Sequence, residues 1–287
     1  MIFMTSLQKK LAVLIVVLTL GILSLDTAIY RAFYINPDHF RTTYQTIRSP
    51  KIPESMNQVS MVYISDLEYG SFSSPEQTDQ IFTRIRELNP DLFIYGGDLF
   101  ASDYTVSDAD KDQMAAWLSA IPAPLGKFAV WGEQDLVSEG RMQNVSEICS
   151  RSEVEILDNT SRLIANQSRD GIRLCAFGLN LNPETALAGT SPDQFGLAVS
   201  HYPDNLLADA AASAPLDLAL AGNAHGTQIT WPIKGGYRLW PGSEKLNRAD
   251  RKNLPFDYYL TSGLGCINIK ARLNAPVEIV YLMFEHS

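Results

Sequence analysis

Apolar and polar positions divide the chain into an N-terminal apolar run and a longer part in which short apolar runs alternate with polar segments. Two lysines precede the run from Leu11 to Leu25, which Thr27 to Tyr30 extends past Asp26. The uninterrupted run is shorter than the roughly twenty residues that cross a bilayer, so a cleaved signal peptide and a buried helix are alternatives. No small-residue cleavage site follows convincingly, which favours a retained signal anchor over residues 1–30 as a transmembrane helix.

The charges beside this run predict its orientation. Lys9 and Lys10 favour the cytoplasm for the N-terminal end, which places the rest of the chain outside the cytoplasm. Arg31 and Arg41 lie just beyond the other end and weaken this asymmetry. The expectation is a single-pass protein of the cell membrane with an extracytoplasmic domain.

The segment from Asp38 to Pro53 is mostly polar, which predicts a linker over residues 31–55 and one domain over residues 56–287. Strands and helices alternate in the first half of that domain. The predicted strands are 59–65, 91–95 and 127–131, and the predicted helices are 75–88 and 107–120. Ser107 and Asp110 form a capping box at the start of the second helix.

The second half of the domain is rich in strands. The predicted strands cover 154–157, 162–165, 172–177, 195–200, 216–221, 228–232, 258–262 and 277–284, with one helix near 205–212. A change from alternating strands and helices to clustered strands predicts an α/β fold in which two sheets pack together and helices flank them.

Composition narrows the choice of partners. The net charge is −9 and no stretch is densely basic, which argues against nucleic acid held through its backbone. A small phosphorylated ligand held by a metal stays compatible with this charge. Cys149, Cys175 and Cys266 lack metal-ligand spacing and are expected to be buried. Tyr202 and Trp231 are expected in the core rather than against a ligand.

Five short fragments with potential metal ligands each follow a strand-like apolar run. Strand ends form the usual ligand-binding edge of an α/β sheet, so these side chains are expected to lie together. The fragments are Ser65-Asp66-Leu67-Glu68, Gly97-Asp98-Leu99-Phe100-Ala101, Gly132-Glu133-Gln134-Asp135, Ser200-His201 and Gly222-Asn223-Ala224-His225-Gly226.

In order and spacing these fragments resemble the calcineurin-like metallophosphoesterases, in particular their small membrane-anchored bacterial branch. That family carries Asp-x-His, Gly-Asp-x-x-Asp, Gly-Asn-His-Asp/Glu, a lone His and Gly-His-x-His, and holds two metal ions with them. The resemblance covers about Tyr44 to Phe284. It implies a four-layer αββα sandwich of two mixed sheets with the site at the sheet edges.

The resemblance also implies two cation positions that share one carboxylate. The first would take Asp66, Glu68, Asp98 and His225, and the second would take Asp98, Glu133, His201 and Asn223. Glu68 and Glu133 stand where the family has His and Asn, and Asn223 stands where it has His. These replacements can still coordinate, and they favour manganese, magnesium or calcium over zinc. A single cation beside a hydrogen-bonded polar cluster is the alternative.

The candidate catalytic residues are Gln134, at the position of the family's general-acid histidine, and Asp135, where the family keeps an acid. Ala101 stands where the family has the aspartate that orients the histidine, and Asp103 is the candidate to compensate. Glutamine donates hydrogen bonds but does not deliver a proton near neutral pH. General acid catalysis is typically worth about 100-fold to 10,000-fold.

Two functions follow from the resemblance. The first is an anchored phosphoesterase that hydrolyses a phosphorylated envelope compound, small molecule or lipid head group with water activated by one or two divalent cations. The second is a family member without turnover that binds a metal or a phosphoryl group as a sensor or scaffold. The retained ligands favour the first function, and the loss of the acid at Ala101 and Gln134 favours the second.

Overall fold

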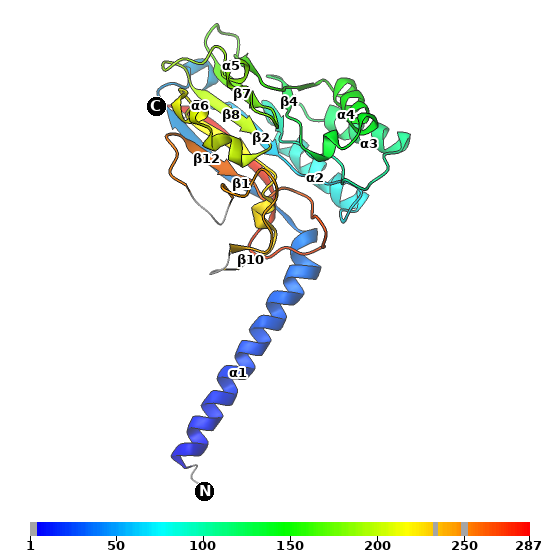
Figure 1. The fold of residues 1–287 in the computed structure, drawn as a ribbon, viewed down its shortest axis with the longest axis vertical. Coiled ribbons are helices and arrows are strands. Elements are labelled where there is room, and N and C mark those ends of the chain that lie inside the picture. Colours follow the sequence, from blue (N-terminus) through cyan, green and yellow to red (C-terminus); the bar gives the residue numbers. More distant parts are fainter. Residues whose placement is uncertain (1–4, 232–234, 248–251) are drawn as a thin grey trace.

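The computed structural model of the protein describes residues 5–231, 235–247 and 252–287. Its first helix, α1 at Ser6–Tyr30, projects away from the domain and continues into a π-helical turn at Arg31–Ile35 (Figure 1). The most apolar window of this helix has a mean hydropathy of 2.4, and none of that window is buried. The alternative of a buried helix is therefore wrong. Length and composition suit a membrane-crossing helix, and they suit a signal sequence equally.

The first sheet combines parallel strands with one antiparallel junction. In the described residues its order is β1-β13-β2-β3-β4-β5, with bounds Phe40–Ser49, Val277–His286, Ser60–Ile64, Leu92–Tyr95, Lys127–Ala129 and Val154–Ile156. Strands β2 to β5 are parallel, β13 is antiparallel to β2, and β1 is parallel to β13. Strands β2 and β3 are buried at every position, as expected for strands covered on both faces.

The second sheet is also mixed. Its order in the described residues is β12-β9-β8-β7-β6, with bounds Asp257–Leu260, Leu218–Ala221, Gly196–Ser200, Ile172–Phe177 and Thr160–Ile164. All neighbours are parallel except β6, which is antiparallel to β7. A short hairpin pairs β10, Thr230–Trp231, with β11, Gly235–Gly236.

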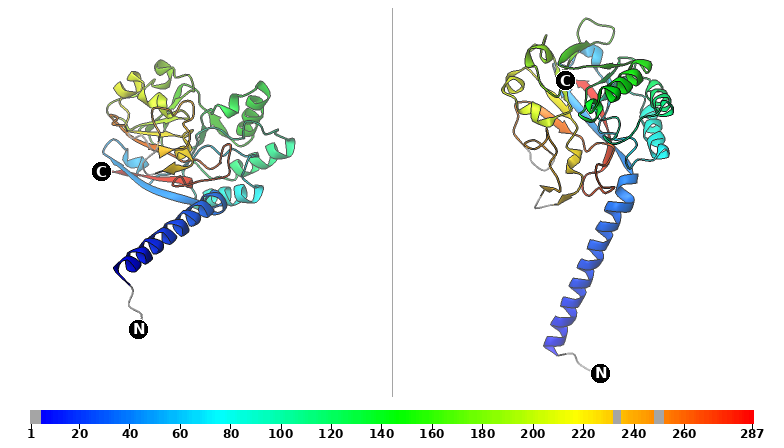
Figure 2. Two further views of the ribbon diagram at one scale, coloured as in Figure 1. Left: turned by 60° about the horizontal axis from the view of Figure 1, so that its bottom comes forward. Right: turned by 45° about the vertical axis from the view of Figure 1, so that its right-hand side comes forward.

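The two sheets pack face to face, and helices cover their outer faces (Figures 1 and 2). Tyr63 and Ile94 of the first sheet and Val199 and Leu220 of the second belong to one buried cluster between the sheets. A second cluster joins the first sheet to α2, Pro75–Leu88, α3, Asp108–Ser119, and α4, Glu139–Arg151. A third lies under α5, Pro183–Ala186, and α6, Asp209–Ser213. The predicted αββα order is confirmed.

Short 3-10 turns connect several of these elements. They lie at Asn36–Asp38, Glu54–Met56, Gln134–Leu136, Pro203–Leu207 and His225–Thr227. Two of the turns follow strands and carry candidate site residues, so the site is built where strands give way to tight turns.

The predicted linker over residues 31–55 is wrong, because this segment belongs to the domain. Strand β1 pairs with β13 along its full length, and Ile52 is fully buried between the sheets. The polar residues of β1 suggested a linker because β1 lies at the edge of its sheet. Every residue of this strand is half-buried or exposed, and an edge strand tolerates polar side chains. Residues 40–55 are therefore part of the folded domain.

Two further differences concern single elements. Helix α4 was not predicted, because Val145, Ile148 and Cys149 give it only a narrow buried stripe in an otherwise polar stretch. The strand predicted at 228–232 is reduced to β10, and its last residue, Pro232, lies outside the described residues. The expectation for the three cysteines is confirmed, since all are buried.

Candidate metal centre

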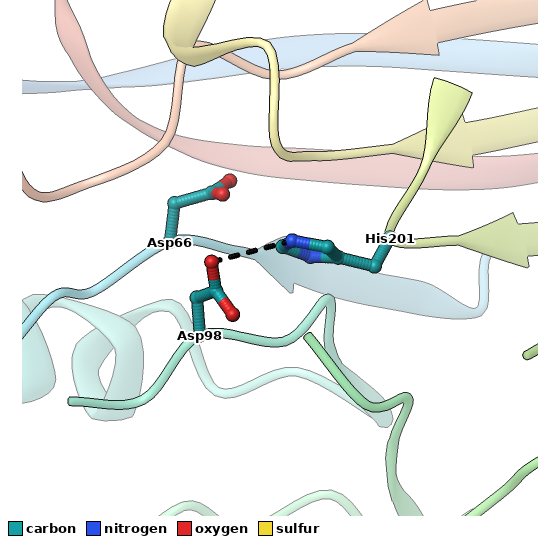
Figure 3. Close-up of side chains that lie close together, drawn as sticks. All are labelled: Asp66, Asp98 and His201. Atoms are coloured by element: carbon teal, nitrogen blue, oxygen red, sulfur yellow. Dashed lines mark ion pairs between the residues drawn. The ribbon is translucent and has the colours of Figure 1, made fainter. Parts of the chain in front are cut away.

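The predicted ligands come together where strands of both sheets end. Asp66, Asp98 and Glu133 follow β2, β3 and β4 of the first sheet, and His201 and the Asn223 loop follow β8 and β9 of the second. Parallel strands present their carboxyl ends at one edge, so the packed sheets bring these loops face to face. Figure 3 shows Asp66, Asp98 and His201 turned toward one another.

Backbone contacts lock the first two loops together. The N–H of Asp66 donates to the carbonyl of Gly97 at 2.9 Å, and the N–H of Glu68 donates to the carbonyl of Asp98 at 3.1 Å. Asp66, Glu68 and Asp98 have φ values of 55°, 50° and 63°, in the left-handed region that costs a non-glycine residue about 1 to 3 kcal/mol. A Cβ at Gly132 would lie 2.0 Å from Asp98 Oδ1, so this close approach requires glycine. Three of the proposed ligands therefore carry this backbone strain.

His201 is oriented by the chain and faces two carboxylates. Its Nδ1 donates to the carbonyl of Gly96 at 2.7 Å, which leaves Nε2 directed at the other side. Nε2 lies 2.8 Å from Glu133 Oε2 and 3.3 Å from Asp98 Oδ2, the pair joined by the dashed line in Figure 3. Ligand atoms of Asp66, Asp98 and His201 all lie within 4.8 Å of one another.

A second group of ligands surrounds His225. Its Nε2 lies 3.5 Å from Asp66 Oδ1 and 3.9 Å from Glu68 Oε1. The N–H of Asn223 donates to Asp66 Oδ1 at 2.9 Å, and the Asn223 side-chain amide donates to the carbonyl of Pro241 at 2.6 Å. With its amide nitrogen engaged, Asn223 has its side-chain oxygen as the atom that can bind a cation.

Burial and mutual repulsion shift the acids of this cluster. Burial, only partly offset by His201, raises the pKa of the Asp98 carboxyl to about 8. Burial together with Asp98 and Asp66 holds the pKa of Glu68 well above its ordinary value. Burial opposes a charged His201 ring, but Asp98 and Glu133 raise the pKa of that imidazole well above its usual range. The cluster has more carboxylates than its own positive charges can neutralise.

These residues fit a divalent cation. Within the described residues, Glu68 Oε1, Asp98 Oδ2 and His225 Nε2 are buried and make no hydrogen bond. Buried polar atoms are normally hydrogen-bonded, so buried carboxylate and imidazole atoms without a hydrogen bond suit a site that holds a metal ion.

The two candidate catalytic residues occupy different environments. Asp135 is buried, and its carboxylate accepts the N–H groups of Asp98, Leu99 and Gly132 at 2.9 to 3.0 Å. Gln134 is partly exposed, its N–H donates to Asp98 Oδ1 at 2.8 Å, and its side-chain amide lies 3.4 Å from Glu133 Oε1. Asp135 therefore has its oxygens engaged in positioning, while Gln134 lies at the rim of the cluster.

The loop beside Gln134 is held by Arg141, which the sequence did not single out. Arg141 is buried, and its guanidinium donates to the carbonyls of Phe100, Ala101, Gln134 and Tyr104 at 2.5 to 3.3 Å. It stands in a helix without any recognisable motif, so no sequence pattern could have revealed it. Asp103, the residue expected to compensate for Ala101, is exposed.

A second buried arginine, Arg272, supports the other side of the site. Its side chain donates to the carbonyl of Ser262 at 2.7 Å and to that of Gly265. This loop in turn contacts the first ligand, because the N–H of Gly265 donates to the carbonyl of Asp66 at 2.6 Å. Arg272 also contacts the turn that follows α1, since its backbone N–H donates to the carbonyl of Ala32.

Taken with the architecture, the relatives support a class: the chain is similar to proteins named metallophosphoesterase, which agrees with the resemblance to the calcineurin-like metallophosphoesterases. It is 24% identical over 266 residues to the uncharacterized metallophosphoesterase YkuE of Bacillus subtilis, a match that covers 86% of each chain. It is 25% identical to the phosphodiesterase YaeI of Escherichia coli, over 77% of this chain and 80% of that protein.

Two other similarities are more partial. The chain is 22% identical to a Danio rerio transmembrane protein with a metallophosphoesterase domain, a match that covers 83% of this chain and 55% of that protein. The crystal structure of the Pseudomonas putida nuclease MPE superposes on 62% of this chain and 66% of its own, with 14% identity and a TM-score of 0.34. No family model matches the chain.

Proposed function

We propose that the protein is a membrane-anchored, metal-dependent phosphoesterase that acts on a phosphorylated envelope compound or small molecule. The observation that carries this proposal is the group formed by Asp66, Asp98 and His201, whose ligand atoms lie within 4.8 Å of one another. Among the described residues, Glu68 Oε1, Asp98 Oδ2 and His225 Nε2 are also buried without a hydrogen bond. The relatives named metallophosphoesterase and phosphodiesterase support the same class of reaction.

The ligands divide into two sets around Asp98. Asp66, Glu68, Asp98 and His225 would hold one divalent cation, and Asp98, Glu133, His201 and Asn223 would hold the other. When bound, such a cation lowers the pKa of a coordinated water and polarises phosphoryl oxygens. The carboxylate-rich set favours manganese, magnesium or calcium over zinc.

The residues around the cations would orient the reaction. The water oxygen forms a bond to phosphorus, the ester oxygen leaves, and one proton of the water ends on that leaving oxygen. Gln134 at the rim offers a hydrogen bond to the leaving oxygen and no proton. Asp135 and Arg141 hold the loops that carry Asp98 and Gln134. Substrates with acidic leaving groups, such as aryl phosphates, should therefore react faster than alkyl esters.

Helix α1 supports a position of the domain at a membrane surface. Helix α1 has the length and hydropathy of a spanning helix, and relatives from Danio rerio and Bos taurus are named transmembrane proteins. Lys9 and Lys10 support an orientation in which the domain lies outside the cytoplasm.

The test is an assay of the full chain in detergent micelles. Aryl phosphomonoesters and phosphodiesters are supplied with manganese, magnesium, calcium or zinc, and bound metal is measured in parallel. We expect turnover with a hard cation. Bound metal without turnover on any of these substrates would favour the alternative, a family member that acts as a sensor or scaffold.

A further inference from the structure

The directions of the strands put the proposed metal centre at the end of the domain from which α1 leaves. β1 leaves the end of the anchor and runs parallel to β13, which is antiparallel to β2. β2 therefore runs back toward the anchor, and so do β3 and β4, which are parallel to it. Because the candidate ligands follow the carboxyl ends of these strands, they lie at the end of the domain from which α1 leaves.

A hairpin segment, residues 228–231 and 235–240, joins the metal centre to the anchor. At one end it follows His225, and at the other the Trp240 ring lies 5.9 Å from the His225 ring. In its middle, the N–H of Thr230 donates to the carbonyl of Leu273, the neighbour of Arg272. Arg272 bonds to the anchor end through its own N–H to Ala32 and through its carbonyl, which accepts from Asn36 at 2.8 Å.

This hairpin segment exposes large apolar side chains. Trp231 is 45% exposed, Tyr237 41% and Leu239 49%. The expectation that Trp231 lies in the core is therefore wrong. Figure 1 places β10 at the end of the domain from which α1 leaves, and the right-hand view of Figure 2 agrees. Exposed apolar side chains of this kind mark a contact surface. Because these lie beside a helix long and apolar enough to cross a bilayer, the bilayer is the partner that fits them.

The anchor carries matching aromatic residues at the same end. Tyr30 and Tyr34 are 58% and 68% exposed, and their rings stack at 5.3 Å between centroids. Tyrosine and tryptophan gather at the level of lipid head groups, where an apolar body and a polar tip are both satisfied. Beside them, a hollow of about 490 Å³ is lined by Arg31, His39 and Arg41, which suit the phosphates of lipid head groups.

We propose that the hairpin segment rests in the bilayer interface and that the metal centre therefore acts on a phosphorylated amphiphile held in the membrane. This proposal rests on the proposed phosphoesterase function. Water adds to the phosphorus of the lipid head group, the ester oxygen leaves with a proton from that water, and the acyl chains stay in the bilayer. Trp231, Tyr237 and Leu239 hold the domain against the surface from which the head group enters.

The contact is tested by quenching of Trp231 fluorescence in the full chain, reconstituted in vesicles with lipids brominated near the top of the acyl chain. The difference between the wild type and Trp231→Phe isolates this residue. The control is Leu163→Trp in the Trp231→Phe background, because Leu163 is 41% exposed and pairs with Arg173 at the far end of β7. We expect strong quenching of Trp231, because tryptophan at the interface lies close to the top of the acyl chains, and little quenching at position 163. Equal quenching at both positions, or none, would overturn the proposal.

The substrate class is tested with two esters that share one leaving group. One is a diacylglycerol p-nitrophenyl phosphodiester in phosphatidylcholine vesicles, and the other is methyl p-nitrophenyl phosphate in water. The triple variant Trp231→Ser, Tyr237→Ser, Leu239→Ser should lose about tenfold in kcat/KM on the embedded ester, because interfacial binding scales with buried apolar area. Its kcat/KM on the soluble ester should stay unchanged.

The outcomes separate this proposal from the proposed function. If the wild type hydrolyses neither ester although it binds metal, the phosphoesterase function fails, and quenching of Trp231 still decides the membrane contact. If the wild type hydrolyses the soluble ester and the triple variant keeps the wild-type kcat/KM on both esters, the phosphoesterase function stands and the proposal of a membrane-held substrate is wrong.

Discussion

Asp135 holds two loops of the site with one carboxylate, so its replacement should displace these loops and the side chains that they carry. Asp135→Asn replaces an oxygen acceptor by an amide that faces backbone N–H groups of Asp98, Leu99 or Gly132. Leaving buried donors unpaired costs about 1 to 3 kcal/mol each, so we expect unfolding at lower urea and a stability loss of about 2 to 4 kcal/mol. Metal affinity, measured by calorimetry, should fall by about tenfold.

Asp103→Asn is the matched control for this variant, because Asp103 is an exposed acid on the neighbouring loop. It should change neither urea stability nor metal affinity. If both variants behave like the wild type, Asp135 does not position Asp98.

In the proposed function, Gln134 and Ala101 limit the leaving groups that the site can release. The double variant Gln134→His, Ala101→Asp should raise kcat/KM on alkyl phosphoesters by at least about tenfold, the low side of what a general acid contributes. On aryl esters, whose leaving group needs no proton, the same variant should change little. The measurement is a plot of log kcat/KM against the pKa of the leaving group for the wild type and the double variant. The same slope in both proteins would contradict the role given to Gln134.

At the residue scale, the sequence predicted the candidate ligands but not the residues that hold the ligand loops in place. Asp66, Asp98 and His201 stand in short fragments after apolar strands, and that pattern is visible in one dimension. Arg141 and Arg272 act by donating to carbonyls of residues that are distant in the sequence. Such contacts depend on the folded backbone, so a pattern of residue types does not predict them.

At the element scale, β1 is the clearest difference between the sequence and the fold. Its Thr42, Tyr44 and Ile47 have strand character, but an edge strand keeps polar residues, and the pattern resembled a linker. Its hydrogen-bonding partner, β13, lies at the other end of the chain. Pairing over such a distance is set by the tertiary fold and leaves no local signature.

Hydrogen exchange of the full chain in micelles tests the position of β1. Strand β1 is hydrogen-bonded to β13 on one side, so we expect slow exchange for roughly alternate amides of residues 40–49. A linker would exchange all of these amides as fast as an unstructured peptide. Fast exchange throughout the segment would show that the domain begins later than proposed.

At the scale of the whole molecule, the proposed metal centre links the two sheets, since its candidate ligands come from both. Cation binding should therefore stabilise the entire domain. At a free cation concentration a hundred times the dissociation constant, the gain is about 2.7 kcal/mol. For a domain of this size, that corresponds to a rise in Tm of about 5 to 10 °C.

Differential scanning fluorimetry with manganese, magnesium and calcium, followed by chelation, measures this rise. Asp98→Asn should abolish it, because Asp98 belongs to both proposed ligand sets. A cation-dependent rise that persists in Asp98→Asn would place the cation elsewhere.

The central claim is that Asp98 lies at the heart of a metal-dependent phosphoesterase site. It is tested most directly by kcat/KM on an aryl phosphoester for the wild type, Asp98→Asn and Asp103→Asn, with and without a hard cation. We predict cation-dependent turnover in the wild type and in Asp103→Asn, and none in Asp98→Asn. Turnover that survives in Asp98→Asn, or a metal-loaded wild type without turnover, would contradict this account.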